Sequence, residues 1–96
     1  MSLPFTKRLR EPIKQGEITS SVRIWQTPRV RLGGRYQLDE GHVEVTGLQE
    51  IALGDITPAL ARAGGFAGVI DLLKIARHGA GNRVFLVTFV YQPPEG

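Results

Sequence analysis

Cysteine is absent from this 96-residue chain, so disulfides, thiol nucleophiles and thiolate metal sites are excluded. No apolar run approaches the roughly 20 residues that a membrane-spanning helix needs. The first residues, Met1 to Phe5, do not contain the apolar stretch of a secretory signal. We therefore expect a cytoplasmic protein that does not associate with membranes.

Histidine is scarce as well. The two histidines, His42 and His78, have no partner at the spacing of metal ligands, so we expect no metal site. The sequence Gly79-Ala80-Gly81 follows a predicted helix rather than a strand, which does not match the dinucleotide-binding fingerprint. A Ser-His-acid set cannot be assembled from the sequence alone. We therefore expect no cofactor and assign no catalytic residue.

Positive charge is concentrated at the start of the chain. Residues 1–35 contain eight basic and two acidic side chains, a net charge of +6, whereas residues 36–96 contain four basic and seven acidic ones, a net charge of −3. Such an asymmetry creates a local field that attracts polyanions. The basic stretch 7–10, with Lys14 close by, has the composition of a tract that follows a phosphate backbone. The alternative is that these cations are simply solvated.

The length of the chain predicts a single domain covering residues 1–96. Alternating or continuous apolar residues predict strands at 18–25, 35–38, 42–53 and 83–92, with short extended stretches at 3–9 and 30–32. Short helices are expected from Pro12 to Gly16, from Thr57 to residue 63, and over 66–77.

The predicted strand 83–92 is apolar on both faces, so we expect it to be central. Gly47 lies inside the longest strand and predicts a bulge or a sharp bend. Together the elements predict an α+β fold, a small mixed β-barrel of five to six strands with two to three short helices.

The predicted strand 18–25 separates two kinds of side chain. Its apolar residues face the core, and its other face carries Thr19, Ser21, Arg23 and Trp25. Hydroxyls donate to phosphate oxygens and a guanidinium binds them bidentately, so this face suits a phosphate or a base edge. Trp25 has a ring on which a base can stack. The alternatives are an ordinary solvated face and a tryptophan that covers the core.

A longer motif spans the predicted first helix and this strand. It reads Phe5-x-x-Arg8-(x)4-Ile13-x-x-Gly16-x-x-Thr19-x-x-x-Arg23, and it resembles the opening signature of the ASCH domain family. The resemblance extends over nearly the whole chain, to the final strand around residues 85–89. It implies a PUA-like fold, a small closed β-barrel with short helices, and a role in recognising RNA or a nucleotide.

Within this family, the chain is most similar in size to the small bacterial acetylcytidine amidohydrolases. These enzymes use a lysine two residues after the motif glycine, a threonine three residues further on, and a glutamate in the helical part. Here the lysine position holds Ile18, the threonine position holds Ser21, and the glutamate falls near Gly64 or Gly65. Two of the three catalytic groups are therefore missing, and losing acid–base groups normally ends turnover.

We therefore expect a small domain that binds RNA or a nucleotide through a basic cleft and does no chemistry of its own. The residues expected to bind are Lys7, Arg8, Arg10, Thr19, Ser21, Arg23, Trp25 and Arg29. One alternative is a diverged amidohydrolase or an RNA-cleaving enzyme that uses Lys7 or Lys14 with Ser21. Another is an adaptor whose barrel edge contacts a second protein. The oligomeric state is left open.

Overall fold

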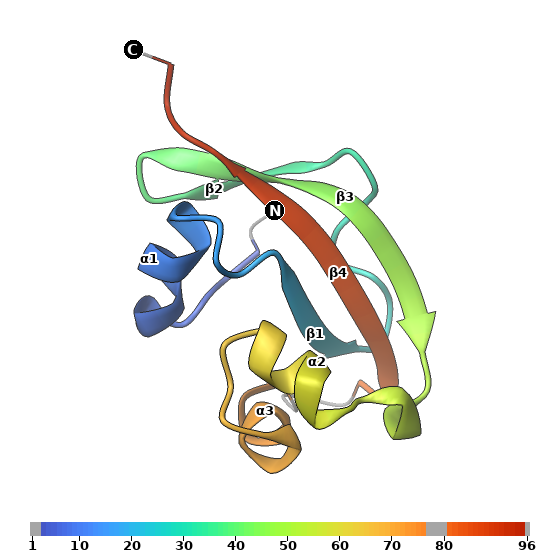
Figure 1. The fold of residues 1–96 in the computed structure, drawn as a ribbon. Helices are drawn as coiled ribbons and strands as arrows, with labels where there is room; N and C mark the ends of the chain where they lie inside the picture. The colour runs from blue at the N-terminus through green and yellow to red at the C-terminus, as the bar shows by residue number, and fades with distance from the viewer. Residues whose placement is uncertain (1–2, 77–80, 96) are drawn as a thin grey trace.

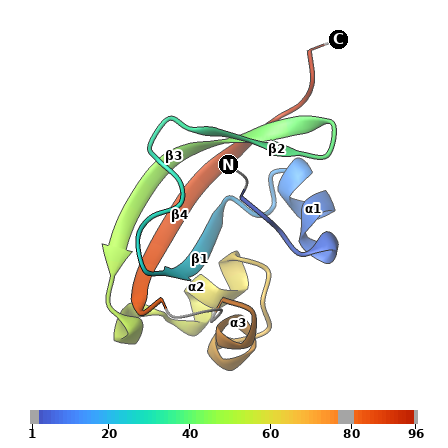
Figure 2. The same cartoon turned by 180° about the vertical axis from the view of Figure 1, so that it is seen from behind.

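A four-stranded antiparallel sheet forms the body of the structure, a computed structural model that describes residues 3–76 and 81–95. The strands are β1 (Ser20–Trp25), β2 (Arg35–Leu38), β3 (Gly41–Ile51) and β4 (Arg83–Gln92), in the order β1-β4-β3-β2. The sheet curls into a half-barrel (Figure 1, and from behind in Figure 2). The other elements are α1 (Lys7–Lys14), a 3₁₀ turn (Leu53–Asp55), α2 (Pro58–Ala63) and α3 (Val69–Ala76).

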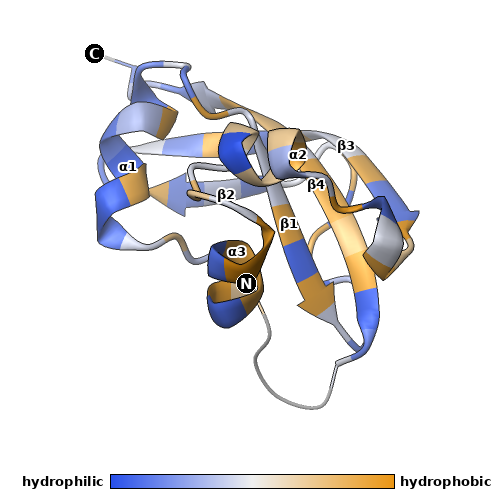
Figure 3. Cartoon of the chain, turned by 60° about the horizontal axis from the view of Figure 1, so that its bottom comes forward, coloured by the Kyte–Doolittle hydropathy of each residue, from blue (hydrophilic) through white to orange (hydrophobic). Residues whose placement is uncertain are grey.

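β4 is a central strand, as its two apolar faces predict. It pairs with β1 on one side and with β3 on the other. Phe85, Val87 and Phe89 are buried on one of its faces and Val84 on the other. Figure 3 shows that β4 is apolar over most of its length, whereas polar and apolar residues alternate along β1. Burial on both faces explains the continuous apolar run of β4.

The curl of the sheet has a local cause in β3. The pairing register between β3 and β4 shifts between Val45 and Gly47, so one extra residue is inserted as a β-bulge. Bulges bend the strand and increase its twist. A Cβ atom at Gly47 would lie 3.2 Å from the side chain of Thr88, which is tighter than ordinary contact. The predicted bend at Gly47 is confirmed.

Two expectations about the sheet are wrong. The described residues form four strands rather than five or six, and all four are antiparallel rather than mixed. The stretches 3–9 and 30–32 do not become strands. The first runs into α1. The second is interrupted by a turn in which the Gly34 N–H donates to the Arg31 carbonyl (3.0 Å) and Gly33 adopts a φ of +80°.

The start of α1 also differs from the prediction. The helix begins at Lys7, so Pro12 lies inside it rather than in its first turn. Proline removes one N–H from the helical ladder at that position. The helix nevertheless continues, because Leu9 and Ile13 lie one turn apart on one face and are both buried in the core. Its end agrees with the prediction, since Gly16 follows with a φ of +78°.

The three helices cover different parts of the sheet. Helix α1 contacts β4, whereas α2 and α3 contact β1. As predicted, Thr57 caps α2, because its hydroxyl accepts a hydrogen bond from the Leu60 N–H (3.1 Å). Helix α3 begins at Val69 rather than at residue 66. No helix in the described ranges has the length and apolar character needed to cross a bilayer.

β1 lies at an edge of the sheet, and both of its faces are covered. Val22 and Ile24 are buried toward the core, as predicted. On the opposite face, Arg23 is paired with Phe85 of β4, so the two side chains share that face. The N-terminal segment covers it: the Phe5 ring lies against the Phe89 ring at 5.3 Å between centroids. The polar residues of β1 therefore lie beside apolar rings rather than on an open exterior.

Candidate ligand-binding cleft

A cavity of about 220 Å³ lies along β1. Its walls come from the N-terminal segment and α1, from β1 and the residues around it, from the loop between α2 and α3, and from the end of α3. The lining residues are Pro4, Phe5, Thr6, Leu9, Ile18, Ser20, Ser21, Val22, Arg23, Ile24, Trp25, Arg29, Gly64, Phe66, Ile75 and Ala76. Elements that are distant in sequence therefore converge on this cleft.

Arg23 is the most constrained cation in the cleft. Its Nε donates to the Ser21 hydroxyl (2.8 Å), and its Nη2 donates to the Pro4 carbonyl (2.7 Å). Its guanidinium carbon lies 4.9 Å from the centre of the Phe5 ring, at cation–π distance. Burial lowers the pKa of Arg23 to about 10, so the side chain stays protonated at neutral pH. The cleft thus holds a fixed positive charge against neutral oxygens and an aromatic face.

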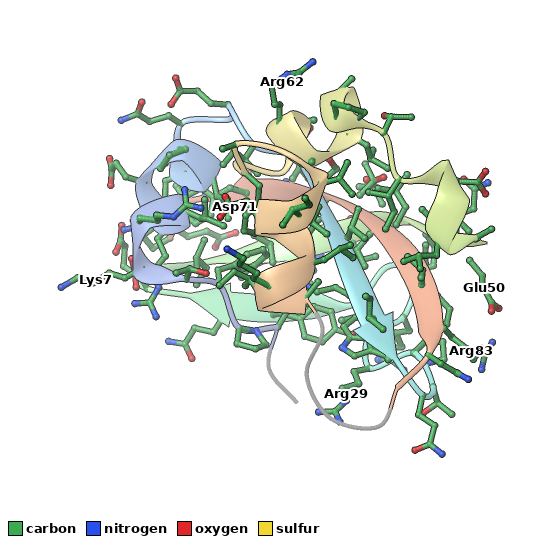
Figure 4. All side chains as sticks on the ribbon, turned by 90° about the horizontal axis from the view of Figure 1, so that it is seen from below. Lys7, Arg29, Glu50, Arg62, Asp71 and Arg83 are labelled. Atoms are coloured by element: carbon green, nitrogen blue, oxygen red, sulfur yellow. The ribbon has the colours of Figure 1, made fainter. Side chains whose placement is uncertain are left out.

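Arg29 and Trp25 complete this end of the cleft. Arg29 is exposed and lines the cavity at its rim. Figure 4 shows Arg29 on the opposite side of the molecule from Arg62, a basic residue that does not line the cavity. Trp25 is half-buried, and its ring lies 5.8 Å from the Phe85 ring. The two interpretations of Trp25 are therefore compatible, because one part of the residue packs on the core and another part lines the cleft.

The described lining residues carry hydroxyls and guanidinium groups but no carboxylate, histidine or lysine. Such a set can hold an anion and an apolar ring, because hydroxyls and arginines donate hydrogen bonds and the aromatic residues offer a stacking surface. It contains no group that titrates near neutral pH. The described lining therefore offers donors and aromatic surface to an anion that carries a ring.

The basic stretch at the start of α1 does not line the cleft. Arg8 donates to the Gly65 carbonyl (2.9 Å), lies 4.0 Å from Asp71 and covers the Phe66 ring. Arg10 lies 3.3 Å from the Asp39 carboxylate. Most of this charge is therefore used to attach α1 to neighbouring elements.

Lys7 and Thr19 also lie outside the cleft. Lys7 has no ion pair with a described residue, and Figure 4 shows it projecting away from the body, far from Arg29. Thr19 is exposed, and its carbonyl accepts a hydrogen bond from the Phe89 N–H. Of the eight predicted binding residues, the structure brings together Ser21, Arg23, Trp25 and Arg29 and leaves the other four outside.

Several lining residues were missed by the sequence reasoning. Ser20 belongs to the face of β1 that was assigned to the core. Pro4 and Phe5 come from the stretch 3–9, where only Lys7 and Arg8 were predicted to bind. Since β1 is an edge strand, a cavity along its edge receives residues from both faces, which strict alternation does not predict. Ile18, Ser21 and Gly64, which hold or adjoin the positions of the amidohydrolase groups, line this same cavity.

The structure describes no metal centre in residues 3–76 and 81–95: no three histidine or acidic side chains there are grouped as ligands. His78 and Gly79-Ala80 lie outside the described residues. Comparisons with protein-family models, with curated proteins and with solved structures give no match for this chain. The ASCH resemblance therefore remains a prediction.

Proposed function

We propose that this chain is a cytoplasmic PUA-like ASCH domain that binds RNA or a nucleotide in the cleft along β1 and catalyses no reaction. One observation carries the proposal: two arginines line an apolar cleft whose described walls contain no carboxylate. Uncompensated positive charge beside aromatic rings is the combination that single-stranded nucleic acids recognise, through phosphate contacts and base stacking.

The contrast with the other cations strengthens this observation. Arg8, Arg10 and Lys14 all have carboxylate partners, whereas the hydrogen bonds of Arg23 go to a hydroxyl and a carbonyl. Neutral acceptors fix the direction of the guanidinium and leave its charge uncompensated. Its charge is then available to a bound anion, and charge-assisted hydrogen bonds are about twice as strong as neutral ones.

The size and the walls of the cleft favour a small aromatic group. Pockets for drug-sized ligands measure roughly 300–1,000 Å³, and this cleft measures about 220 Å³. It therefore suits one base rather than a large ligand. Phe5, Trp25 and Phe66 supply aromatic surface, and Arg29 at the rim is in position for a phosphate that remains outside the cavity.

The described lining supports the absence of catalysis. Neither Lys7 nor Lys14 lines the cleft, so the alternative in which one of them acts with Ser21 has no geometric support. Lys14 instead contacts Asp39 (2.8 Å) and Glu40 (3.1 Å). The convergence of Ile18, Ser21 and Gly64 on one cavity supports the ASCH resemblance and is compatible with a domain that kept the ligand site without the acid–base groups.

Trp25 provides a direct test, because it is the only tryptophan in the chain and it lines the cleft. Short single-stranded RNAs are titrated into the protein while Trp25 fluorescence is recorded at several salt concentrations. We expect saturable quenching, with an affinity that falls by a log–log slope of about −0.7 per phosphate contact.

Two arginine variants and one matched control complete the experiment. Arg23→Ala and Arg29→Ala should weaken binding, whereas Arg31→Ala should not. Arg31 is exposed and does not line the cleft. The proposal is overturned if RNA and nucleotides fail to bind at low salt, or if all three variants bind as the unmodified protein does.

A further inference from the structure

The hydrogen-bonding pattern of β1 leaves one of its edges free. The Phe89 N–H donates to the Thr19 carbonyl (2.9 Å), and the register continues through Ser21 with Val87 and Arg23 with Phe85. In an antiparallel ladder, residues that exchange hydrogen bonds with the partner strand alternate with residues whose N–H and C=O groups point away from it. The second set in β1 consists of Ser20, Val22 and Ile24.

The residues that carry these outward main-chain groups belong to the wall of the cleft. Ser20, Val22 and Ile24 all line it, and no described residue forms a hydrogen bond with their N–H or C=O groups outside the β1–β4 ladder. Val22 is 4% exposed and Ile24 is 5% exposed. Main-chain polar groups of buried residues are nearly always paired, because an unpaired group loses its hydration without compensation. A row of alternating donors and acceptors therefore lies along the cleft without a partner among the described residues.

A nucleobase matches this row. The Watson–Crick edge of a base is planar and carries hydrogen-bond donors and acceptors side by side. An extended peptide also pairs with a free strand edge. A partner strand of five residues is about 17 Å long, however, and requires a groove that is open at both ends. The cavity of about 220 Å³ is instead bounded by Phe5, by Phe66 and by the end of α3, which favours a single ring-shaped group.

We infer that the free edge of β1 recognises one base by its Watson–Crick edge, through the N–H and C=O of Val22 and the neighbouring outward groups of Ser20 and Ile24. This inference rests on the proposed function and adds the mode of recognition. The base lies in the cavity, its ring is flanked by the aromatic walls, and the sugar-phosphate extends toward Arg29 at the rim. A base that is blocked at its Watson–Crick edge is then excluded.

The first experiment compares matched nucleotides. The 5′-monophosphates of uridine, cytidine, adenosine and guanosine are titrated into the protein and followed by Trp25 fluorescence, together with N3-methyluridine and N1-methylguanosine 5′-monophosphates, whose bases are also uncharged. Each methylated nucleotide keeps its phosphate and its aromatic ring but loses a Watson–Crick donor or acceptor. We expect methylation to weaken the binding of the parent nucleotide by at least about tenfold, which corresponds to about 1.4 kcal/mol.

The second experiment observes the main chain directly, by amide hydrogen exchange and by the backbone N–H resonances in NMR spectra. In the free protein, the amides of Ser20, Val22 and Ile24 should exchange faster than those of Ser21 and Arg23, which belong to the ladder. Saturation with the best-binding nucleotide should slow the exchange of the Val22 amide and shift its resonance. The amide of Phe89, on the other side of the ladder, provides the internal control.

Two variants separate the contribution of the Val22 N–H to binding from that of the Val22 side chain. Val22→Pro removes the outward N–H, and proline is tolerated in an edge strand at positions whose N–H does not pair. Val22→Ala keeps this N–H and loses comparable packing. We expect Val22→Pro to weaken nucleotide binding at least tenfold relative to Val22→Ala. If Val22→Pro does not fold, the methylated nucleotides and the exchange measurements decide the question.

The outcomes distinguish this inference from the proposed function. If RNA and nucleotides bind, but methylated and unmodified bases bind equally and the Val22 amide does not change, main-chain recognition is overturned and the binding function stands. If no nucleotide or RNA binds, both are overturned. If nucleotides leave the three outward amides unchanged and an extended acidic peptide protects them, the edge binds peptides and the inference is wrong.

Discussion

Two regions of this small domain carry arginine and lysine side chains in opposite ways. In α1, Arg10 lies 3.3 Å from Asp39, and Lys14 contacts both Asp39 and Glu40 in the turn between β2 and β3. In the cleft along β1, Arg23 has only neutral hydrogen-bond partners. The first region uses its charge to join elements of the fold. The second leaves its charge available to a ligand.

The difference teaches that a count of basic residues does not locate a binding surface. Both regions belong to the same positively charged part of the sequence, and what separates them is the presence of a carboxylate across the fold. The acidic partner of Arg10 is 29 positions away in the chain. Long-range pairing therefore decides which cations remain available to a polyanion.

The most direct test of this comparison removes one arginine from each region. Arg23→Ala should weaken nucleotide binding by about 1.5–3 kcal/mol, which is typical of a hydrogen bond to a charged group. Arg10→Ala should leave binding unchanged, because Arg10 does not line the cleft. Trp25 fluorescence titrations at low salt measure both variants. Equal losses in the two variants would show that the basic surface acts as a whole and would contradict the distinction.

Gly65 packs against α1 and against Ile18 of the cleft, and its substitution should give the next largest effect, on the free energy of unfolding. Its φ is +92°, and an added Cβ would lie 2.5 Å from Leu9 Cδ2 of α1 and 2.8 Å from Ile18 Cδ1. Gly65→Ala should therefore lower the free energy of unfolding by roughly 1–3 kcal/mol, the range for a residue held in an unfavourable backbone conformation.

Gly64→Ala is the matched control for this change. Its φ is negative, and the added Cβ would be in ordinary contact with the Ser20 carbonyl at 3.5 Å. Chemical denaturation of both variants should show a clear loss of stability for Gly65→Ala and a much smaller change for Gly64→Ala. Similar losses would contradict the close packing of α1 against the loop after α2.

Much of the fold follows from local signals in the sequence. The alternation of residues 18–25, the two apolar faces of 83–92, the Thr57 cap and the bend at Gly47 all predict features that the structure contains. Each of these depends on residues that are close together in the chain, so a single sequence is sufficient to find them.

The errors have a different physical origin. The proline signal at Pro12 competed with the burial of Leu9 and Ile13, and tertiary packing decided where α1 begins. The cleft has a wall on this side because the N-terminal segment folds over one face of β1. Such contacts between distant segments have no periodicity. The sequence therefore predicted Ser21, Arg23, Trp25 and Arg29 but not the walls that other segments add to the cleft.

The ion pairs between α1 and the turn after β2 should make the stability of the fold decrease in acid. A hydrogen bond from Lys14 holds the pKa of Asp39 below its usual value of 3.8. A hydrogen bond from its own backbone N–H, and then one from Lys14, lowers the pKa of Glu40 below 4.5. Carboxyl groups with lowered pKa values stabilise the fold above their usual pKa, and this stabilisation is lost as the pH falls through the lowered values. Stability should therefore decrease below about pH 4.

Asp39→Asn tests this explanation. The variant should lose less stability than the unmodified protein between about pH 5 and pH 2, because one of the titrating groups has been removed. Glu17→Gln is the control, since Glu17 is exposed and forms no ion pair with a described residue. Thermal unfolding at a series of pH values measures all three proteins. The explanation is wrong if the two variants show the same acid dependence.

The smallest change is expected in the free energy of unfolding of the Arg10→Ala variant. The Arg10 side chain is 42% exposed and its 3.3 Å contact with Asp39 is partly exposed to solvent, so side-chain entropy and screening by salt offset most of the attraction. The free energy of unfolding should fall by about 0.2–1 kcal/mol, and less at high salt. Urea denaturation at low and high salt measures the change. A much larger loss would mean that this ion pair holds α1 in place. The exposed charges of α1 would then contribute more to the stability of the fold than a solvent-screened ion pair does.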